Sequence, residues 1–154
     1  MPPSSSPPDQ AIDQRQAVAR VVDFFEGLQP ADVARMGEFY TADAYFKDPF
    51  NEVRGVPEMQ RIFRHMYDAL DAPRFVIHDK IVDGSQCFLT WDFEFRFKRF
   101  DKARLQTVRG GSHLKLSPDG LVVFHRDYWD AAEELYEKLP VVGGLMRWLK
   151  RQAG

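Results

Sequence analysis

The sequence has little of what secreted, membrane-spanning or nucleic-acid-binding proteins need. It contains a single cysteine, Cys87, which excludes an internal disulfide and leaves secretion unsupported. Its longest uncharged apolar run, residues 139–146, is far shorter than the roughly 20 residues that span a bilayer. No charged segment followed by an apolar one opens the chain, so we expect no signal peptide. These absences predict a cytoplasmic globular protein.

The charges also argue against a nucleic-acid partner. The formal net charge is -2, and the Lys and Arg residues are scattered rather than gathered in a basic stripe. The length of 154 residues is typical of one domain. Aromatic residues are abundant, at 14% of the chain, which supplies a core and leaves rings for a lined cavity or a partner surface.

Helical spacing comes first along the chain and strand spacing follows. Residues 1–10 are rich in Pro and Ser and predict a disordered tail. Apolar residues then follow helical spacing in three segments, which begin near Asp9, Pro30 and Pro57. After Pro73 the apolar period changes to two. We expect strands over residues 44–49, 75–82, 87–100, 106–116 and 121–129.

Helices followed by a meander of antiparallel strands predict an α+β fold. We place this domain at residues 11–138 and expect a C-terminal amphipathic helix at 139–154. That helix combines Trp148 and Leu149 with Arg147 and Lys150, so it suits a lid or a dimer contact. The same composition permits contact with a membrane surface, although the helix is short for that role.

The long strand has two chemically different faces. Trp91, Phe93 and Phe95 alternate with Thr90, Asp92 and Glu94. The pattern alone favours aromatic rings in the core and charges in water, as in most antiparallel strands.

The last strand carries His125 and Asp127 on one face, together with Leu121, Val123 and Trp129. A buried carboxylate without a partner is costly. Asp127 therefore either forms a structural pair or faces a small solvated cavity where a carboxylate has a use. His125 alone is equally consistent with a satisfied core histidine.

Two motifs and the order of elements resemble the nuclear transport factor 2-like superfamily, in its SnoaL-like branch. The motifs are "EFYTADAYFKDPFNEVRGVPEMQRIF", residues 38–63, and "HRDYWD", residues 125–130. The resemblance implies a cone-shaped domain in which a curved antiparallel sheet is wrapped by N-terminal helices around a pocket. It also implies that Asp92 and Glu94 face this pocket, and that the domain forms a homodimer through the sheet face with Trp91, Phe93 and Phe95.

The resemblance also implies candidate site residues. Ketosteroid isomerases are similar at "FKDP", where Asp48 would move a proton, but the positions of their two oxyanion donors, a Tyr and a protonated Asp, fall near Phe24 and Ser112. Without both donors a developing oxyanion is poorly stabilised, so the sequence does not predict ketosteroid isomerase activity itself. Limonene epoxide hydrolases are similar around "RDYWD", where Asp127 would activate water, although Asp92 replaces their bridging arginine. The catalytic candidates are Asp48, Asp127, His125 and Glu94, and the pocket-lining candidates are Phe24, Phe46, Thr90, Asp92, Ser112 and Met66.

These residues suit an acid–base enzyme that needs no cofactor. We expect an isomerase, hydrolase or dehydratase acting on a small, mostly apolar molecule. No compact ligand spacing points to a metal site. The Asp48-Pro49 pair could equally be a strand terminator. The alternative function is a non-catalytic domain that binds a small ligand or assembles as a dimer through the same surfaces.

Overall fold

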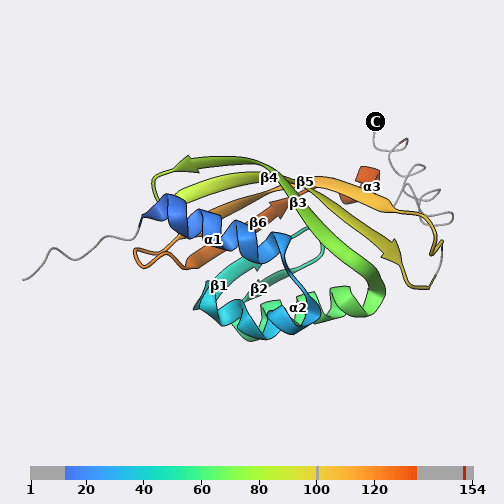
Figure 1. Ribbon diagram of the computed structural model, residues 1–154, viewed down its shortest axis with the longest axis horizontal. Coiled ribbons are helices and arrows are strands. Elements are labelled where there is room, and N and C mark those ends of the chain that lie inside the picture. The colour runs from blue at the N-terminus through green and yellow to red at the C-terminus, as the bar shows by residue number, and fades with distance from the viewer. Residues whose placement is uncertain (1–12, 100, 135–150, 152–154) are drawn as a thin grey trace, which may run out of the picture.

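The computed structural model describes residues 13–99, 101–134 and 151 (Figure 1). It has the expected α+β fold, with helices before a long antiparallel meander. The helices are α1 (Gln14–Glu26), the 3-10 helix η1 (Pro30–Glu38), α2 (Val56–Ala69) and α3 (Ala131–Glu134). The strands are β1 (Tyr40–Lys47), β2 (Glu52–Arg54), β3 (Leu70–Asp83), β4 (Gln86–Phe97), β5 (Gln106–Leu116) and β6 (Val122–Tyr128).

The helix boundaries follow local chemistry. The side chain of Asp13 accepts a hydrogen bond from the backbone N–H of Arg15 at 3.0 Å and caps α1. Pro30 begins η1, where a missing N–H costs nothing. Gly55 precedes α2 at φ +98°, a conformation that L side chains rarely adopt. Among the described residues, no helix is long and apolar enough to cross a membrane.

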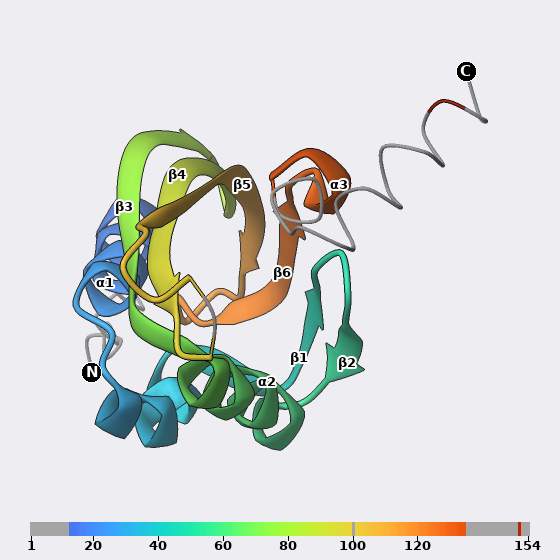
Figure 2. The same ribbon diagram turned by 90° about the vertical axis from the view of Figure 1, so that its right-hand side faces the viewer.

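The six strands form one curved sheet in the order β2-β1-β6-β5-β4-β3. All neighbours are antiparallel except β1 and β6, which run parallel. Figure 2 shows the sheet curving from edge strand β3 on one side to edge strand β2 on the other, with α2 lying across the open side between them. Because α2 contacts β1, β2 and β3, it closes the concave face of the sheet.

The strand predictions succeed best where turns are strong. Asp83 and Gly84 end β3 in a hairpin between the strands predicted at 75–82 and 87–100, with Gly84 at φ +57°. β5 has the predicted bounds, and β6 is one residue shorter at each end. β2 was not predicted, and β1 begins at Tyr40 rather than at residue 44. The predicted tail at 1–10 and C-terminal helix at 139–154 lie outside the described residues, apart from Arg151.

The two faces of β4 correct the assignment that the resemblance implied. Trp91 and Phe95 are 5% and 3% exposed, and Phe93 and Phe97 pack against the core beside them. These rings point to the concave face, toward the interior of the domain. A homodimer contact through Trp91, Phe93 and Phe95 is therefore wrong, because those side chains are not on the outer surface.

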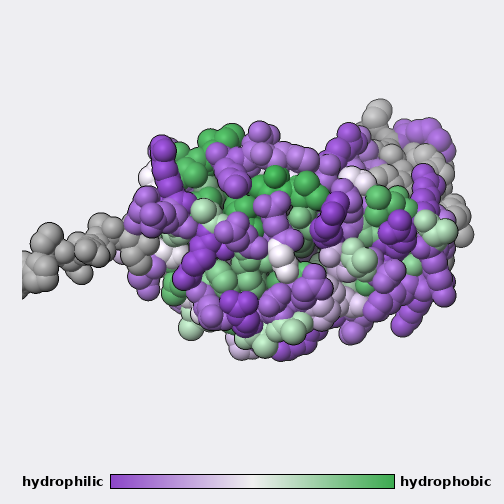
Figure 3. Space-filling model, viewed as in Figure 1, coloured by the Kyte–Doolittle hydropathy of each residue, from purple (hydrophilic) through white to green (hydrophobic). Residues whose placement is uncertain are grey.

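The polar side chains of β4 lie on the convex face, outside the domain interior. Thr90, Asp92 and Glu94 were predicted at the pocket wall, and this placement is wrong. Each pairs instead with a side chain of β3: Thr90 with Asp79 at 2.7 Å, Asp92 with His78 at 3.1 Å, and Glu94 with Arg74 at 3.1 Å. Alternation of apolar and polar residues, read without the resemblance, gives the observed arrangement. Figure 3 shows one side of the molecule, with apolar side chains gathered among mostly hydrophilic ones.

Candidate functional site

Asp127 lies on the wall of two cavities enclosed by the curved sheet. It stands near the end of β6, and its side chain is 17% exposed. The larger cavity has a volume of about 260 Å³. The smaller one, of about 20 Å³, lies deeper among core side chains and has room for about one water molecule. Asp127 is therefore a carboxylate in largely apolar surroundings.

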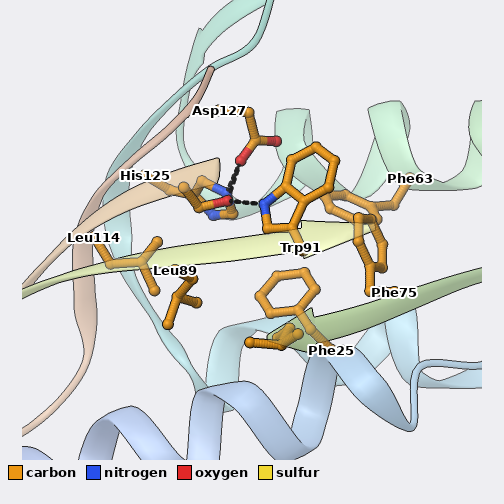
Figure 4. A pocket seen from close by; sticks show the side chains of 10 residues that line it. Phe25, Phe63, Phe75, Leu89, Trp91, Leu114, His125 and Asp127 are labelled. Carbon is orange, nitrogen blue, oxygen red and sulfur yellow. Dashed lines mark hydrogen bonds and ion pairs between the residues drawn. The ribbon is translucent and has the colours of Figure 1, made fainter. Parts of the chain in front are cut away.

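One oxygen of Asp127 is held by two hydrogen bonds. The hydroxyl of Ser112 donates to Oδ1 at 2.5 Å, and Nε2 of His125 lies 2.7 Å from the same oxygen. The indole N–H of Trp91 donates to the Ser112 oxygen at 2.8 Å. Figure 4 shows Asp127, His125 and Trp91 pointing toward one another, with Phe63 and Phe75 beside the indole.

The contacts of His125 match one tautomer of its ring. A carboxylate oxygen accepts hydrogen bonds, so Nε2 of His125, which lies 2.7 Å from Oδ1 of Asp127, is the donor. In the neutral ring Nδ1 is then an acceptor, and the Tyr40 hydroxyl, 2.7 Å away, donates to it. Burial, and then the charge of Asp127, raise the pKa of Tyr40 well above its ordinary value, so this hydroxyl keeps its proton. Two series of hydrogen bonds therefore end at Oδ1 of Asp127, one from Tyr40 through His125 and one from Trp91 through Ser112.

The second oxygen of Asp127, Oδ2, has no hydrogen-bond partner among the described residues. The same network that restrains Oδ1 therefore leaves Oδ2 as the oxygen of this cavity-lining carboxylate that is available to a ligand. A carboxylate held in this way keeps one orientation, which is what a positioned proton acceptor requires.

The larger cavity is bounded by α2, β4, β6 and the loop after β1. Its polar lining residues are Asp48, Asn51, His65 and Asp127. Most of the remaining wall is aromatic and comes from Phe46, Phe50, Phe63, Phe75, Trp91, Phe93, Phe95, Phe97 and Trp129. A cavity of this size and composition suits a small ligand that is mostly apolar.

Asp48 reaches the same cavity but is engaged in its own loop. Its Oδ1 accepts hydrogen bonds from the backbone N–H groups of Phe50 and Asn51, both at 2.7 Å. The side-chain amide of Asn51 donates to both oxygens of Asp48 at 3.1 Å. This is the turn that the Asp-Pro pair predicted as an alternative. Asp48 therefore shapes the cavity mouth and is less free than Asp127 to accept a proton.

The structure brings together most of the candidate residues. Asp48, Phe46 and Met66 line the larger cavity, Ser112 and His125 line the smaller one, and Asp127 lines both. Their catalytic or binding roles stay predictions.

Phe24 does not line either cavity. It is buried on α1 and stacks on Phe39 with 4.1 Å between ring centroids, whereas the next residue, Phe25, lines the smaller cavity. On α1, Phe25 rather than Phe24 faces this cavity, so the pocket-lining residue predicted on this helix was wrong by one position. Thr90, Asp92 and Glu94 stay on the convex face.

An open hollow of about 550 Å³ lies on the other side of Asp127. Its lining includes Lys47 and Arg126 as well as Asp48 and Asp127. Lys47 forms an ion pair with Glu52 at 3.1 Å, and the Arg126 guanidinium lies 4.7 Å from the centre of the Tyr128 ring. These cations belong to the outer side of the sheet and not to the wall of the larger cavity.

Sequence reasoning missed Tyr40 as a partner of His125. The two residues are 85 positions apart and meet because β1 and β6 pair in parallel. A parallel pairing between distant segments leaves no turn motif in the sequence. No group of three or more His, Cys, Asp or Glu side chains is arranged for a metal ion within the described ranges.

Comparisons with solved structures show the same fold in several proteins. An LEH-like epoxide hydrolase from M. tuberculosis has a TM-score of 0.65 at 18% identity, over 90% of this chain and 96% of that one. A proposed SnoaL-like polyketide cyclase from Jannaschia sp. CCS1 has a TM-score of 0.66 at 17% identity, over 85% and 93%. A ketosteroid isomerase-like fold from Catenulispora acidiphila, in complex with trimethylamine, has a TM-score of 0.66 at 14% identity, over 78% and 89%.

A search of curated proteins finds no match. The family model described as the SnoaL-like domain matches residues 21–125, which is more than half of the chain. This match includes the second half of α1, the sheet through His125 of β6 and four of the five residues in the Asp127 network. The chain therefore belongs to the SnoaL-like domain family, within the nuclear transport factor 2-like superfamily.

Proposed function

We propose that the protein catalyses proton transfer within a small, mostly apolar molecule, with Asp127 as the general base. The ligand occupies the aromatic cavity beside Oδ2. No cofactor enters the reaction. The observation that carries the proposal is the asymmetry of Asp127, whose Oδ1 is held by Ser112 and His125 while Oδ2 has no partner in the described chain.

The chemical step is an isomerisation. Oδ2 accepts a proton from a carbon of the ligand, and the electron pair of that C–H bond stays on the ligand. The resulting carboxylic acid returns the proton to a different carbon, so the ligand keeps its composition and Asp127 is restored. A positioned base of this kind contributes about 10²–10⁴ in rate.

One free carboxylate favours an isomerase over a hydrolase. Epoxide opening needs a second group that protonates the leaving oxygen, and Glu94, the predicted acid, is paired with Arg74 on the convex face. Asp48 is engaged by Asn51 and the loop backbone. The structural neighbours described as a polyketide cyclase and an epoxide hydrolase support catalysis in this fold, without naming the substrate of this chain.

Exchange of carbon-bound hydrogen for deuterium tests the base directly. The full chain is incubated in D₂O with a panel of small cyclic ketones, some neutral and some carrying a tertiary amine, and deuterium uptake is followed by proton NMR. We expect uptake into at least one ketone. Asp127→Asn removes the proton acceptor and keeps the shape, so uptake should fall by about 10²–10⁴.

Glu94→Gln is the matched control, because it makes the same chemical change on the convex face of the sheet. Its exchange rate should equal that of the wild type. Uptake in Asp127→Asn at the wild-type rate would show that Asp127 is not the base.

The second candidate function is ligand binding without catalysis. It is favoured by the engagement of Asp48 and by the position of Glu94, which together leave no second proton carrier among the predicted catalytic carboxylates. Under this reading a ketone raises the melting temperature of the protein, yet no member of the panel gains deuterium above the buffer rate.

A further inference from the structure

The walls of the larger cavity combine aromatic rings with negative charge. Asp48 and Asp127 are its acidic lining residues, and no Lys or Arg of the described chain lines it. His65 is its one basic side chain, and that residue is exposed on α2. The cations nearest in sequence, Lys47 and Arg126, line the adjoining open hollow, which shares Asp48, Asp127 and Trp129 with the larger cavity, and there they contact Glu52 and Tyr128.

Both features of this wall attract a cation. The face of an aromatic ring carries negative partial charge, and several rings around one space form a cage for ammonium groups. The Asp127 side chain is 17% exposed, and its Oδ2 has no partner in the described chain, so a positively charged ligand group can pair with that oxygen. A neutral hydrocarbon supplies no such partner, a neutral donor supplies a hydrogen bond without charge, and an anion would be repelled.

We infer that the ligand of this cavity is a cation on a mostly apolar body, such as a molecule with a tertiary or quaternary ammonium group. The inference rests on the proposed function in that both place the ligand beside Asp127. It also fits that chemistry, because a positive charge next to a carbon stabilises the electron pair left behind when Asp127 removes the proton.

Three probes of similar size separate charge from shape. Phenyltrimethylammonium and tert-butylbenzene differ by one nitrogen cation in place of a carbon, and benzenesulfonate carries a negative charge on the same ring. Their affinities for the full chain are measured by ligand-observed NMR. We expect the cation to bind at least about tenfold more tightly than its neutral counterpart, and the anion to bind least.

Asp127→Asn should remove most of the preference for the cation, and Glu94→Gln, which changes a charge on the convex face, should keep it. Circular dichroism checks that both variants fold. Should Asp127→Asn fail to fold, the order of the three probes on the wild-type protein still decides the question.

Binding of tert-butylbenzene as tight as that of the cation, or no binding of any probe, would overturn the inference. An unchanged preference in folded Asp127→Asn would also overturn it, because Asp127 would not be the group that recognises the charge. None of these probes needs to lose a proton in order to bind. Failure here is therefore distinct from failure of the deuterium experiment, which tests the base.

Discussion

At the scale of single residues, Tyr40 donates to a histidine that it meets only through the fold. Its ring is 1% exposed, and its hydroxyl is the donor that Nδ1 of His125 requires. In Tyr40→Phe the ring still fills its space, while Nδ1 remains buried without a donor. We expect unfolding free energy to fall by about 1–3 kcal/mol, measured by urea denaturation.

Tyr45→Phe provides the control for that substitution. The Tyr45 hydroxyl donates to Glu52 at 2.8 Å on an exposed surface, where water replaces the lost bond. Its effect should stay below about 0.5 kcal/mol. Equal losses in the two variants would contradict the role assigned to Tyr40, since burial is the property that separates them.

The residues of the Asp127 network differ in how far sequence could find them. Asp127 and His125 are two apart on an apolar strand, so their proximity follows from strand period alone. Ser112 was predicted at the pocket, and it meets Asp127 through the β5–β6 register. The hydrogen bond from the Trp91 indole to Ser112 could not be predicted, because it depends on the side-chain orientation of Trp91, whose ring lies over Gly110 on the neighbouring strand.

At the scale of an element, Gly110 on β5 makes room for that indole. A Cβ atom at this position would lie 2.6 Å from Cη2 of Trp91 and 3.0 Å from Cβ of Trp129. The strand pairs continuously with β4 there, so the glycine marks a close approach of side chains rather than a bulge in the strand.

Gly110→Ala should therefore displace the Trp91 ring and weaken its hydrogen bond to Ser112. We expect a loss of about 1–3 kcal/mol in unfolding free energy, together with a shift in tryptophan emission. Gly37→Ala is the control, because nothing lies within 4 Å of a Cβ placed there. A Gly110→Ala protein as stable as wild type would show that Trp91 can move without cost.

The two faces of β4 show that the alternation of apolar and polar residues in a strand predicts the direction of its side chains. Alternation gave the correct face for Phe93 and for Glu94, and the resemblance reversed it. Relatives at 14–18% identity share the path of the chain, but a shift of register by one residue exchanges the faces of a strand. Fold was predictable from family likeness, whereas the direction of each side chain was a property of this sequence.

At the scale of the whole molecule, the fold encloses a cavity rather than filling its centre. The order of helices and strands was predictable because each has a local period and a turn or cap at its end. The resemblance predicted a pocket but not its volume, because the volume depends on how tightly the sheet curls and where α2 closes it. A protein that keeps such a space gives up packing that a larger side chain would supply.

The substitution Val108→Phe tests whether the protein keeps the cavity open at the expense of core packing. Val108 is 3% exposed on β5 and lines the larger cavity, so a phenyl ring there occupies ligand space. Gained contacts offset local crowding, and we expect unfolding free energy to stay within about 1 kcal/mol of wild type. Affinity for phenyltrimethylammonium should fall at least about tenfold, corresponding to about 1.4 kcal/mol of binding free energy.

Ile81→Phe adds a ring on the outside instead, because Ile81 is 61% exposed on β3. It should leave the affinity unchanged. Wild-type affinity in a folded Val108→Phe protein would mean that the probe binds elsewhere, since a ligand and a phenyl ring cannot share the same space. Reduced affinity with retained stability would instead show that the hollow is kept for a ligand and is not needed to hold the fold together.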